Sequence, residues 1–176
     1  MARTGSTRRV LAWICARPWR IIYILIFAGL FSPALVLADT SCDADEVHLR
    51  GEWGTARFTI ELADEPDEQA EGLMHRESMP RSSGMLFAYP SPRPTRFWMR
   101  NTLISLDMIF ADASGVVQKV HRDARPLDET PIFGGNAIQY VLEINAGLSE
   151  RLGIGPGTQL RHPVIDSGRA AWPCTE

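Results

Sequence analysis

The sequence predicts a mostly β domain, an antiparallel β-sandwich or small barrel with two short helices. Three observations lead to this prediction: short stretches that alternate apolar and polar residues, turns rich in glycine and proline between them, and only two segments with helix start and stop signals. About seven strands are expected, a number typical of sandwiches and small barrels. With 45% hydrophobic and 22% charged residues, the 176-residue chain has the composition of a globular protein.

The first 38 residues differ from the rest and have the layout of a secretory signal peptide. They carry five arginines and no acidic residue ahead of an apolar run over residues 21–38. The small residues before position 39 predict cleavage after Ala38, which leaves a single β domain over residues 39–176. Alternatively, residues 21–38 stay as a membrane anchor, because 18 apolar residues are just long enough to span a bilayer. The domain is therefore expected to be periplasmic or secreted.

Removal of this leader makes the protein more acidic. The chain has 18 basic and 21 acidic residues, and the leader holds five of the basic ones, so residues 39–176 carry 13 basic and 21 acidic residues and a net charge of −8. A nucleic-acid backbone and an anionic membrane surface both repel such a domain. We therefore expect no nucleic-acid partner, and membrane contact only through an uncleaved N-terminal segment. The oligomeric state stays open.

The cysteines agree with export. Cys15 lies in the leader, so the mature domain keeps only Cys42 and Cys174, one near each end. In an oxidising compartment we expect these two to form a disulfide that ties the termini together. The alternative, a zinc site, lacks the third and fourth ligands that zinc requires.

The first part of the domain is predicted to form a hairpin and a helix. Residues 55–62 alternate apolar and polar side chains as a half-buried strand does, and they follow a shorter strand over residues 47–50. The glycine-containing turn between the two predicts a hairpin. Asp64 is the expected N-cap of a short helix that ends at Gly72.

The middle of the domain is predicted to continue as an antiparallel meander. Residues 84–89 form the next strand, and the three alternating prolines that follow predict an extended loop. Residues 96–100 and 105–111 are then expected to pair as a second hairpin, and residues 116–121 add a further strand.

The last part combines a loop, two strands and a helix. Residues 122–137 hold two prolines and a glycine pair, which predicts a long surface loop. Residues 138–144 are expected to form a strand, and Asn145 to cap a short helix that runs to Leu152. A final strand is predicted over residues 159–165.

Several segments occur in the same order as in a known bacterial family. They are Glu68 with Gly72-Leu73-Met74-His75-Arg76, then Gly84-Met85-Leu86-Phe87, then Phe97-Trp98-Met99-Arg100-Asn101-Thr102 with Leu106-Asp107, and finally Tyr140-Val141-Leu142-Glu143. Through them the chain resembles the domain-of-unknown-function family 192 over residues 58–160. The resemblance implies a compact, often exported β fold with no assigned reaction, substrate or cofactor. The chain departs from the family at Arg100, where relatives more often have lysine, and the charge is kept.

The second predicted hairpin provides the candidate functional surface. Strand alternation turns its apolar residues to one face and gathers Arg96, Trp98, Arg100 and Asp107 on the other. An aromatic ring beside an arginine and a carboxylate suits a sugar ring or a flat polar group. The alternative is structural: Trp98 packs under the proline-rich loop, and Asp107 pairs with Arg100 or Arg76.

These residues predict a module that binds a small polar or carbohydrate ligand, with no cofactor. Trp98 would be the platform and the neighbouring polar groups its contacts. The full set of expected ligand-binding residues is Arg76, Trp98, Arg100, Asn101, Thr102, Asp107 and Glu143.

Three other functions stay open. Asp107 and Glu143 could serve as the two carboxyl groups of a hydrolase acting on envelope glycans, if their separation suits it. The domain could also be purely structural. Finally, thioether, imidazole and aromatic groups together can bind Cu(I), although methionines on strands more often fill a core. The residues concerned are Met74, His75, Met79, Met85, Trp98, Met99 and Met108.

Overall fold

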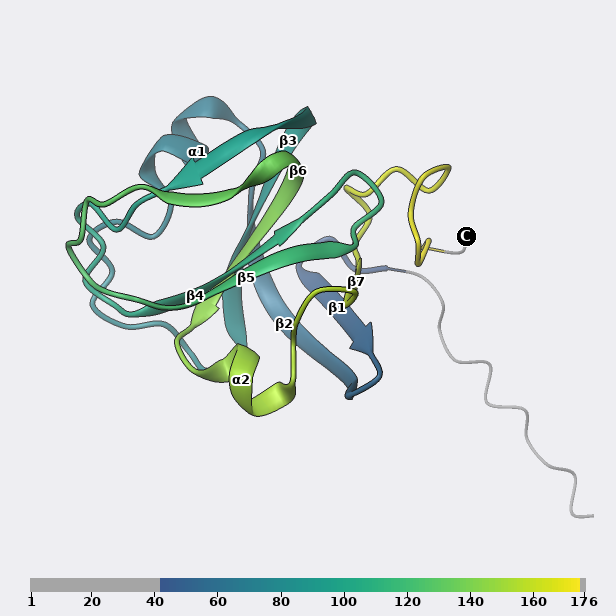
Figure 1. Cartoon of the computed structure of the whole chain (residues 1–176), viewed down its shortest axis with the longest axis horizontal. Coiled ribbons are helices and arrows are strands. Elements are labelled where there is room, and N and C mark those ends of the chain that lie inside the picture. The colour runs from purple at the N-terminus through teal and green to yellow at the C-terminus, as the bar shows by residue number, and fades with distance from the viewer. Residues whose placement is uncertain (1–41, 175–176) are drawn as a thin grey trace, which may run out of the picture. The chain divides into compact units, whose positions relative to one another are not determined.

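A computed structural model describes residues 42–174, which form a curled β-sheet with two short helices (Figure 1). The predicted signal peptide and its cleavage after Ala38 lie outside the described residues. Within residues 42–174, no helix has both the length and the apolar character needed to cross a membrane. The elements are β1 (Glu46–Gly51), β2 (Gly54–Ala63), α1 (Pro66–Glu71), β3 (Ser83–Phe97), β4 (Leu106–Ala111), β5 (Val117–Ala124), β6 (Ile132–Asn145), α2 (Leu148–Leu152) and β7 (Gln159–Arg161).

The seven strands form one mixed sheet with the order β5-β4-β6-β3-β2-β1-β7. β2 and β3 run parallel, and the other neighbouring pairs are antiparallel. The sheet curls into a half-barrel, since its two edges meet at one end: Val117 N–H donates to Thr158 O and Leu160 N–H to Gly115 O, both at 2.8 Å. The mostly β, barrel-like class with two short helices is confirmed. The purely antiparallel meander is wrong, because α1 connects two parallel strands.

The first hairpin forms as predicted. β1 and β2 pair from Glu46 with Thr59 to Gly51 with Gly54, so the turn lies where the glycines were expected. The alternation of β2 also holds, because Phe58 and Ile60 are buried and their neighbours are not.

β3 is longer than predicted and passes through the prolines. Residues 84–89 are its first part, but the strand continues to Phe97. Its ladder with β6 shifts register between Ala88 and Arg93 and again between Arg93 and Thr95. Pro90, Pro92 and Pro94 all fall in these irregular stretches, where a missing N–H breaks no regular ladder bond. The prolines therefore bend this strand rather than end it.

The predicted hairpin of residues 96–100 with residues 105–111 is wrong. β6 lies between β3 and β4 and pairs with both, so residues 98–105 are a loop. Phe97 is opposite Ile132, whereas Phe110 is opposite Val141. A local pattern cannot reveal this insertion, because the inserted strand comes later in the sequence.

Two boundaries near the C-terminal end also differ from the prediction. The loop expected over residues 122–137 is reduced to residues 125–131, because β5 and β6 extend into it from both sides. The last strand is three residues long and ends at Arg161 rather than Ile165.

Both predicted helices form, each one or more residues later than expected. The N-cap of α1 is Glu65 rather than Asp64, and α2 follows Gly147 rather than starting from a cap at Asn145. A glycine ends each helix, as the sequence predicts.

Apolar side chains form two cores, one on each face of the central strands β3, β4 and β6. The core inside the curl takes residues from all seven strands. The second core covers the other face and packs against the segments that follow α1 and β3. Adjacent residues of the central strands therefore face different cores. The residues of the second core are Ala63, Leu73, Met85, Phe87, Met99, Leu106, Met108, Phe110, Ala124, Ile138 and Val141.

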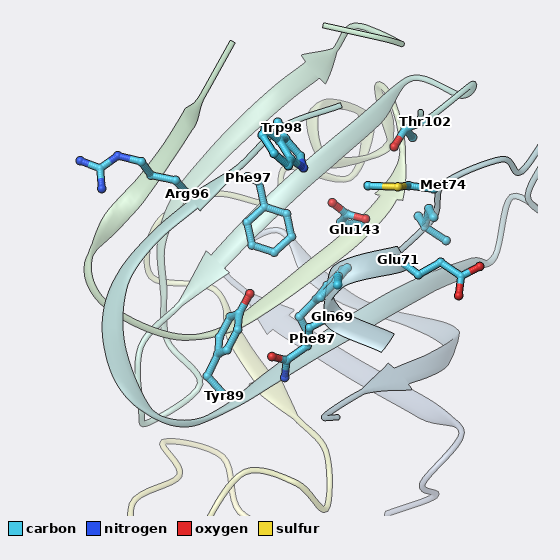
Figure 2. Close-up of a pocket in the computed structure, with 13 residues that line it drawn as sticks. Gln69, Glu71, Met74, Phe87, Tyr89, Arg96, Phe97, Trp98, Thr102 and Glu143 are labelled. Atoms are coloured by element: carbon cyan, nitrogen blue, oxygen red, sulfur yellow. The ribbon is translucent and has the colours of Figure 1, made fainter. Parts of the chain in front are cut away.

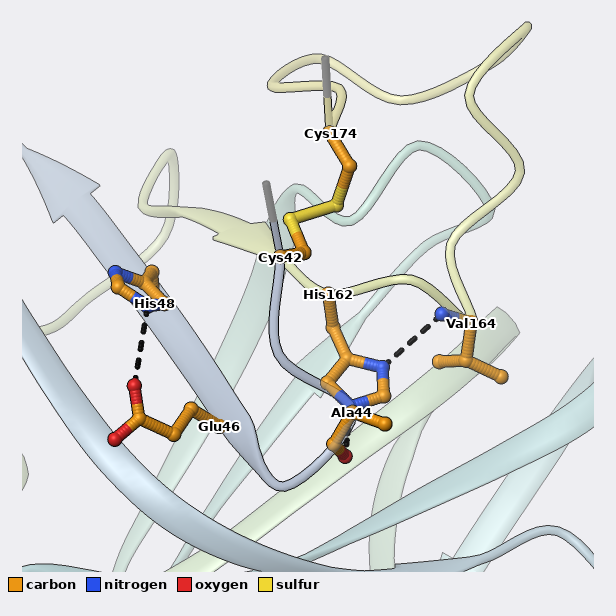
Figure 3. The surroundings of a disulfide bond; sticks show 7 residues. All are labelled: Cys42, Ala44, Glu46, His48, His162, Val164 and Cys174. Carbon is orange, nitrogen blue, oxygen red and sulfur yellow. Dashed lines mark hydrogen bonds and ion pairs between the residues drawn. A yellow bond between two sulfur atoms is a disulfide. The ribbon is translucent and has the colours of Figure 1, made fainter. Parts of the chain in front are cut away.

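The two ends of the described chain are held together by a disulfide and by a buried histidine (Figure 3). Cys42 and Cys174 form the predicted disulfide, with Cα atoms 5.6 Å apart. Beside it, His162 Nδ1 accepts from the Val164 N–H at 3.1 Å, so Nε2 carries the proton and donates to Ala44 O at 2.8 Å. Burial lowers the pKa of His162, which keeps the ring in this neutral form.

Candidate ligand-binding site

A cavity of about 100 Å³ opens on the face of the sheet that carries the second core (Figure 2). Phe87 of β3 and Glu143 of β6 form its floor, and the end of β3 and the following residues contribute Phe97 and Trp98. Met74, after α1, forms the opposite side. Segments far apart in the sequence thus meet around one small space.

Hydrogen bonds fix the wall that follows α1. Gln69 Nε2 donates to Ala63 O at 3.3 Å and to Ala88 O at 2.9 Å, which attaches α1 to both β2 and β3. Further on, His75 N–H donates to Asn101 O at 2.8 Å. The two walls of the cavity are therefore joined to each other as well as to the sheet.

The loop after β3 presents Trp98 at the mouth of the cavity. Met99 anchors this loop, because its side chain is buried in the second core and its N–H donates to Asp128 O at 2.8 Å. Trp98 is 47% exposed, and Arg100 lies over its ring with Cζ 5.7 Å from the centroid. An indole this exposed contributes little to the core and is available to a ligand.

Aromatic rings support one side of the cavity. Phe97 meets the ring of Phe87 edge-on at 5.0 Å and that of Phe110 at 5.9 Å. Such edge-to-face contacts fix ring orientation. The packing of the core beneath the cavity therefore fixes how these aromatic rings are oriented at its wall.

Glu143 is the unusual residue of the site. Its side chain lies on the face of Val141 and Met108, is 4% exposed and lines the cavity, and no hydrogen bond or ion pair within residues 42–174 engages its carboxyl group. Burial raises its pKa to about 8, since removal from water disfavours the charged form. At neutral pH the carboxyl group is therefore mostly protonated. Figure 2 shows it directed towards the space between Trp98, Met74 and Thr102.

Three other titratable or charged side chains line the cavity. Arg96 turns away from Glu143, with its Cζ 5.1 Å from the ring centroid of Phe133 (Figure 2). Tyr89 is half-buried, and this burial raises the pKa of its hydroxyl above the ordinary value. Glu71 stands at the rim. Within the described part of the chain, none of the three is hydrogen-bonded to Glu143 or forms an ion pair with it.

The structure places the seven predicted ligand-binding residues unequally. Trp98, Thr102 and Glu143 line the cavity. Arg76 instead forms an ion pair with Glu61 of β2, and hydrogen bonding to that partner raises its pKa.

Two further predicted contacts flank the cavity without lining it. Arg100 stacks on the ring of Trp98. Asn101 Nδ2 approaches Met74 Sδ at 3.8 Å and its carbonyl receives the His75 N–H, so Asn101 positions the opposite wall.

Asp107 lies on the other face of the sheet. It is fully buried, and its carboxylate accepts from Asp123 N–H at 2.9 Å and Ser149 N–H at 2.8 Å. It is opposite Ile144, whereas Met108 is opposite Glu143, so the sheet separates the two carboxyl groups. The predicted polar face shared by Trp98 and Asp107 is therefore wrong. A hydrolase that uses Asp107 and Glu143 on one bond has no geometric basis.

The methionines are mainly core residues. Met85, Met99 and Met108 are buried in the second core, and only Met74 reaches the cavity. Among residues 42–174, no group of three or more His, Cys, Asp or Glu side chains could hold a metal ion.

Sequence reasoning missed the apolar walls of the cavity. Nothing in strand alternation distinguishes a core phenylalanine from one that borders a cavity. A signal was nevertheless present, because each of the four segments that carry the family resemblance supplies lining residues. They are Gly72, Leu73 and Met74 from the first, Phe87 from the second, Phe97, Trp98 and Thr102 from the third, and Glu143 from the fourth.

Comparison with known proteins agrees with this resemblance. The family model DUF192, described as an uncharacterized ACR, matches residues 47–162. No curated protein matches the chain.

Two crystal structures are similar in sequence and fold. A Novosphingobium aromaticivorans protein of unknown function is 43% identical, with a TM-score of 0.64, over 65% of this chain and 82% of that one. A Sinorhizobium meliloti protein, provisionally described as a transcription regulator, is 40% identical, with a TM-score of 0.65, over 68% of this chain and 94% of that one.

Proposed function

Because the chain belongs to the DUF192 family, which has no assigned reaction, we propose its function from its own cavity: the domain binds a small polar ligand whose head group contacts Glu143. The observation that carries this proposal is the buried carboxyl group, which lacks a partner within residues 42–174. A ligand that bonds to this carboxyl group would give it the hydrogen-bond partner that residues 42–174 do not supply.

The surroundings of Glu143 suit a binding site. The cavity is open to solvent and combines aromatic and apolar side chains with several polar ones, and a small-molecule pocket likewise uses polar groups to orient its ligand. Trp98 is 47% exposed at its mouth, so a ligand would bury indole surface that the fold leaves in water.

The size of the cavity limits what can enter. An apolar cavity of roughly 150 Å³ holds a benzene molecule. A space of about 100 Å³ therefore admits a head group of a few heavy atoms rather than a whole sugar ring. A carbohydrate would have to stack on Trp98 from outside.

We further propose that the domain works outside the cytoplasm. The signal-peptide layout of the first 38 residues supports this, and so does the disulfide between Cys42 and Cys174, since structural disulfides persist mainly in oxidising compartments. To test this location, an epitope-tagged full-length chain is expressed and the cells are fractionated. Recovery of the chain in the cytoplasm with both thiols free contradicts it.

An NMR titration tests ligand binding although the natural ligand is unidentified. The ¹⁵N-labelled domain is titrated with four probes: propylammonium, n-propanol, propanoate and glucose. We expect at least one probe to shift amide signals around the cavity, at Gly72, Trp98 and Thr102, in a saturable manner. Absence of saturable shifts with all four probes contradicts the binding function and favours a structural domain.

A pair of matched variants separates binding from folding. Trp98→Ala should weaken the binding of the active probe and change stability by less than about 1 kcal/mol, because the side chain is largely in water. Leu127→Ala removes another exposed apolar side chain, 59% exposed and outside the cavity, and should change neither. A loss of several kcal/mol in Trp98→Ala would show that Trp98 is a packing residue.

A further inference from the structure

We propose that the cavity receives the ammonium head group of a small amine, which forms an ion pair with Glu143 against the surrounding aromatic rings. This inference rests on the proposed binding function and adds the charge of the ligand to it. Two features favour a cation over a neutral or anionic head group, namely the charges at the cavity and the nature of its walls, and the size of the cavity suits a primary ammonium group.

The charges at the cavity favour a cation. Two carboxyl groups, Glu143 at the floor and Glu71 at the rim, line it. The only guanidinium in the lining is that of Arg96, which turns outward to stack on Phe133 at 5.1 Å. An anionic head group would therefore meet Glu143 without a compensating cation from the described residues within the cavity.

The walls favour a cation as well. Trp98 and Phe97 lie on one side of Glu143, and Tyr89 lines the same cavity farther from it (Figure 2). The face of an aromatic ring attracts a cation. The thioether of Met74 adds a soft, polarisable contact rather than a donor that would compete for Glu143. A neutral hydroxyl group gains less from an aromatic face than a cation does.

The size agrees with a primary ammonium group. The cavity of about 100 Å³ is smaller than the apolar cavity of roughly 150 Å³ that holds a benzene molecule. An ammonium group with one or two methylene groups fits that space, and the remainder of the amine would extend past Trp98 into solvent.

Binding of a cation should release one proton. In the empty cavity Glu143 is protonated at neutral pH, because its pKa is raised to about 8. An ammonium group stabilises the carboxylate, so the carboxyl O–H bond breaks, its proton goes to solvent, and ammonium N–H groups donate to the two oxygens. The net reaction exchanges a bound proton for the bound ammonium ion, and the charges balance.

Two other ionisable side chains that line the cavity, Tyr89 and Glu71, have to be separated from Glu143 in this dependence on pH. Burial raises the pKa of Tyr89 above its ordinary value, so its hydroxyl group stays protonated between pH 6 and pH 8.5. Glu71 lies at the rim of the cavity. The Glu71→Gln variant measures its contribution to binding, and in this variant the affinity for the amine should still depend on pH.

The test compares size-matched probes that differ in charge. Affinities of propylammonium, n-propanol and propanoate are measured by NMR titration at about pH 6 and about pH 8.5, where the amine stays protonated. We expect propylammonium to bind best, with an affinity that rises more than about tenfold between the two pH values as Glu143 ionises. Calorimetry in two buffers of different ionisation enthalpy should show release of close to one proton near pH 7.

Glu143→Gln provides the decisive variant, because it keeps the shape of the side chain and removes its ionisation. It should lower propylammonium affinity at pH 8.5 by at least about tenfold, the effect of one lost charged hydrogen bond, and abolish the pH dependence. Glu129→Gln, at an exposed position outside the cavity, is the matched control and should behave as the original chain.

The outcomes separate the two proposals. If n-propanol, propanoate or glucose binds at the cavity and propylammonium does not, the cationic ligand is wrong and the binding function stands. If propylammonium binds with an affinity independent of pH and of Glu143→Gln, the ion pair is wrong. If no probe binds, both proposals fall together.

Discussion

Asp107 and Glu143 are both buried carboxyl groups, and they differ in their partners. Asp107 receives two backbone N–H groups, from Asp123 and Ser149, which hold the end of β5 and the start of α2 against β4. Glu143 receives none within the described residues and faces a cavity. The partners of Asp107 indicate a structural role, whereas the lack of partners at Glu143, beside open space, supports the ligand-binding role proposed for it.

Asp107→Ala should lower the free energy of unfolding by about 2–4 kcal/mol, because two buried N–H groups lose a charged acceptor. Urea unfolding monitored by fluorescence measures the change. Asp107→Asn keeps one acceptor oxygen and should lose less. Asp64→Ala, at an exposed position, is the control and should stay within about 0.5 kcal/mol. Equal stability of Asp107→Ala and Asp64→Ala would mean that these hydrogen bonds contribute nothing net.

β3 and β6 determine the shape of the site. They are the longest strands of the described chain, they pair with each other, and they provide both Phe87 and Glu143 at the floor of the cavity. β6 also passes close to a side chain of β4, because a Cβ atom on Gly134 would lie 2.1 Å from Cδ1 of Phe110. Glycine at this position lets the strand cross the aromatic ring that supports Phe97.

Gly134→Ala should destabilise the domain by about 1–3 kcal/mol, because the buried Phe110 ring must move and the core is closely packed. Gly155→Ala is the matched control, since a Cβ atom there meets nothing within 4 Å. It should leave stability unchanged or raise it by up to about 1 kcal/mol through a less flexible unfolded chain. Thermal unfolding of the two variants side by side measures the difference, and a Gly134→Ala variant as stable as Gly155→Ala contradicts the close contact.

Elements with local signals were predicted well, and elements set by long-range pairing were not. Alternation over residues 55–62 correctly predicts β2, and glycines correctly mark the ends of both helices. The hairpin after residue 96 failed because β6 inserts between β3 and β4 from a later position in the chain. The three prolines misled as well, since only the register shifts of the ladder show that β3 can accommodate them.

At the scale of the whole molecule, contacts between residues far apart in the sequence hold the fold together. Backbone bonds join residues 115–117 to residues 157–160, and the Cys42–Cys174 disulfide joins positions 132 residues apart. His162 adds two partly buried hydrogen bonds beside the disulfide. The half-barrel, with the cavity on its outer face, is therefore held by contacts that span the described chain.

Loss of the disulfide should lower the free energy of unfolding by about 3–5 kcal/mol, because the unfolded chain regains the freedom of a loop of more than a hundred residues. Urea unfolding of a Cys42→Ser, Cys174→Ser double variant measures this change. The reductant dithiothreitol should destabilise the original domain equally and leave the double variant unaffected. Equal stability of all four samples contradicts a stabilising role.

The site could be predicted only in part, for a reason that belongs to the whole fold. Trp98, Thr102 and Glu143 were expected as ligand contacts, and all three line one cavity. Asp107 was placed beside Trp98 only through the incorrect hairpin, and the face of the sheet it occupies depends on pairing with β6. The sequence shows the chemical type of each side chain, whereas the order of the strands in the sheet decides which of these side chains lie close together.

The most direct measurement is the pKa of Glu143, followed by the ¹³C shift of its side-chain carboxyl carbon across a pH titration of the intact domain. A buried carboxyl group with no partner should titrate at about 8. Addition of saturating propylammonium should lower this pKa, since the cation stabilises the charged form. A pKa near 4.5, the ordinary value for glutamate, would show that Glu143 is hydrated or already paired, and would contradict the site as described.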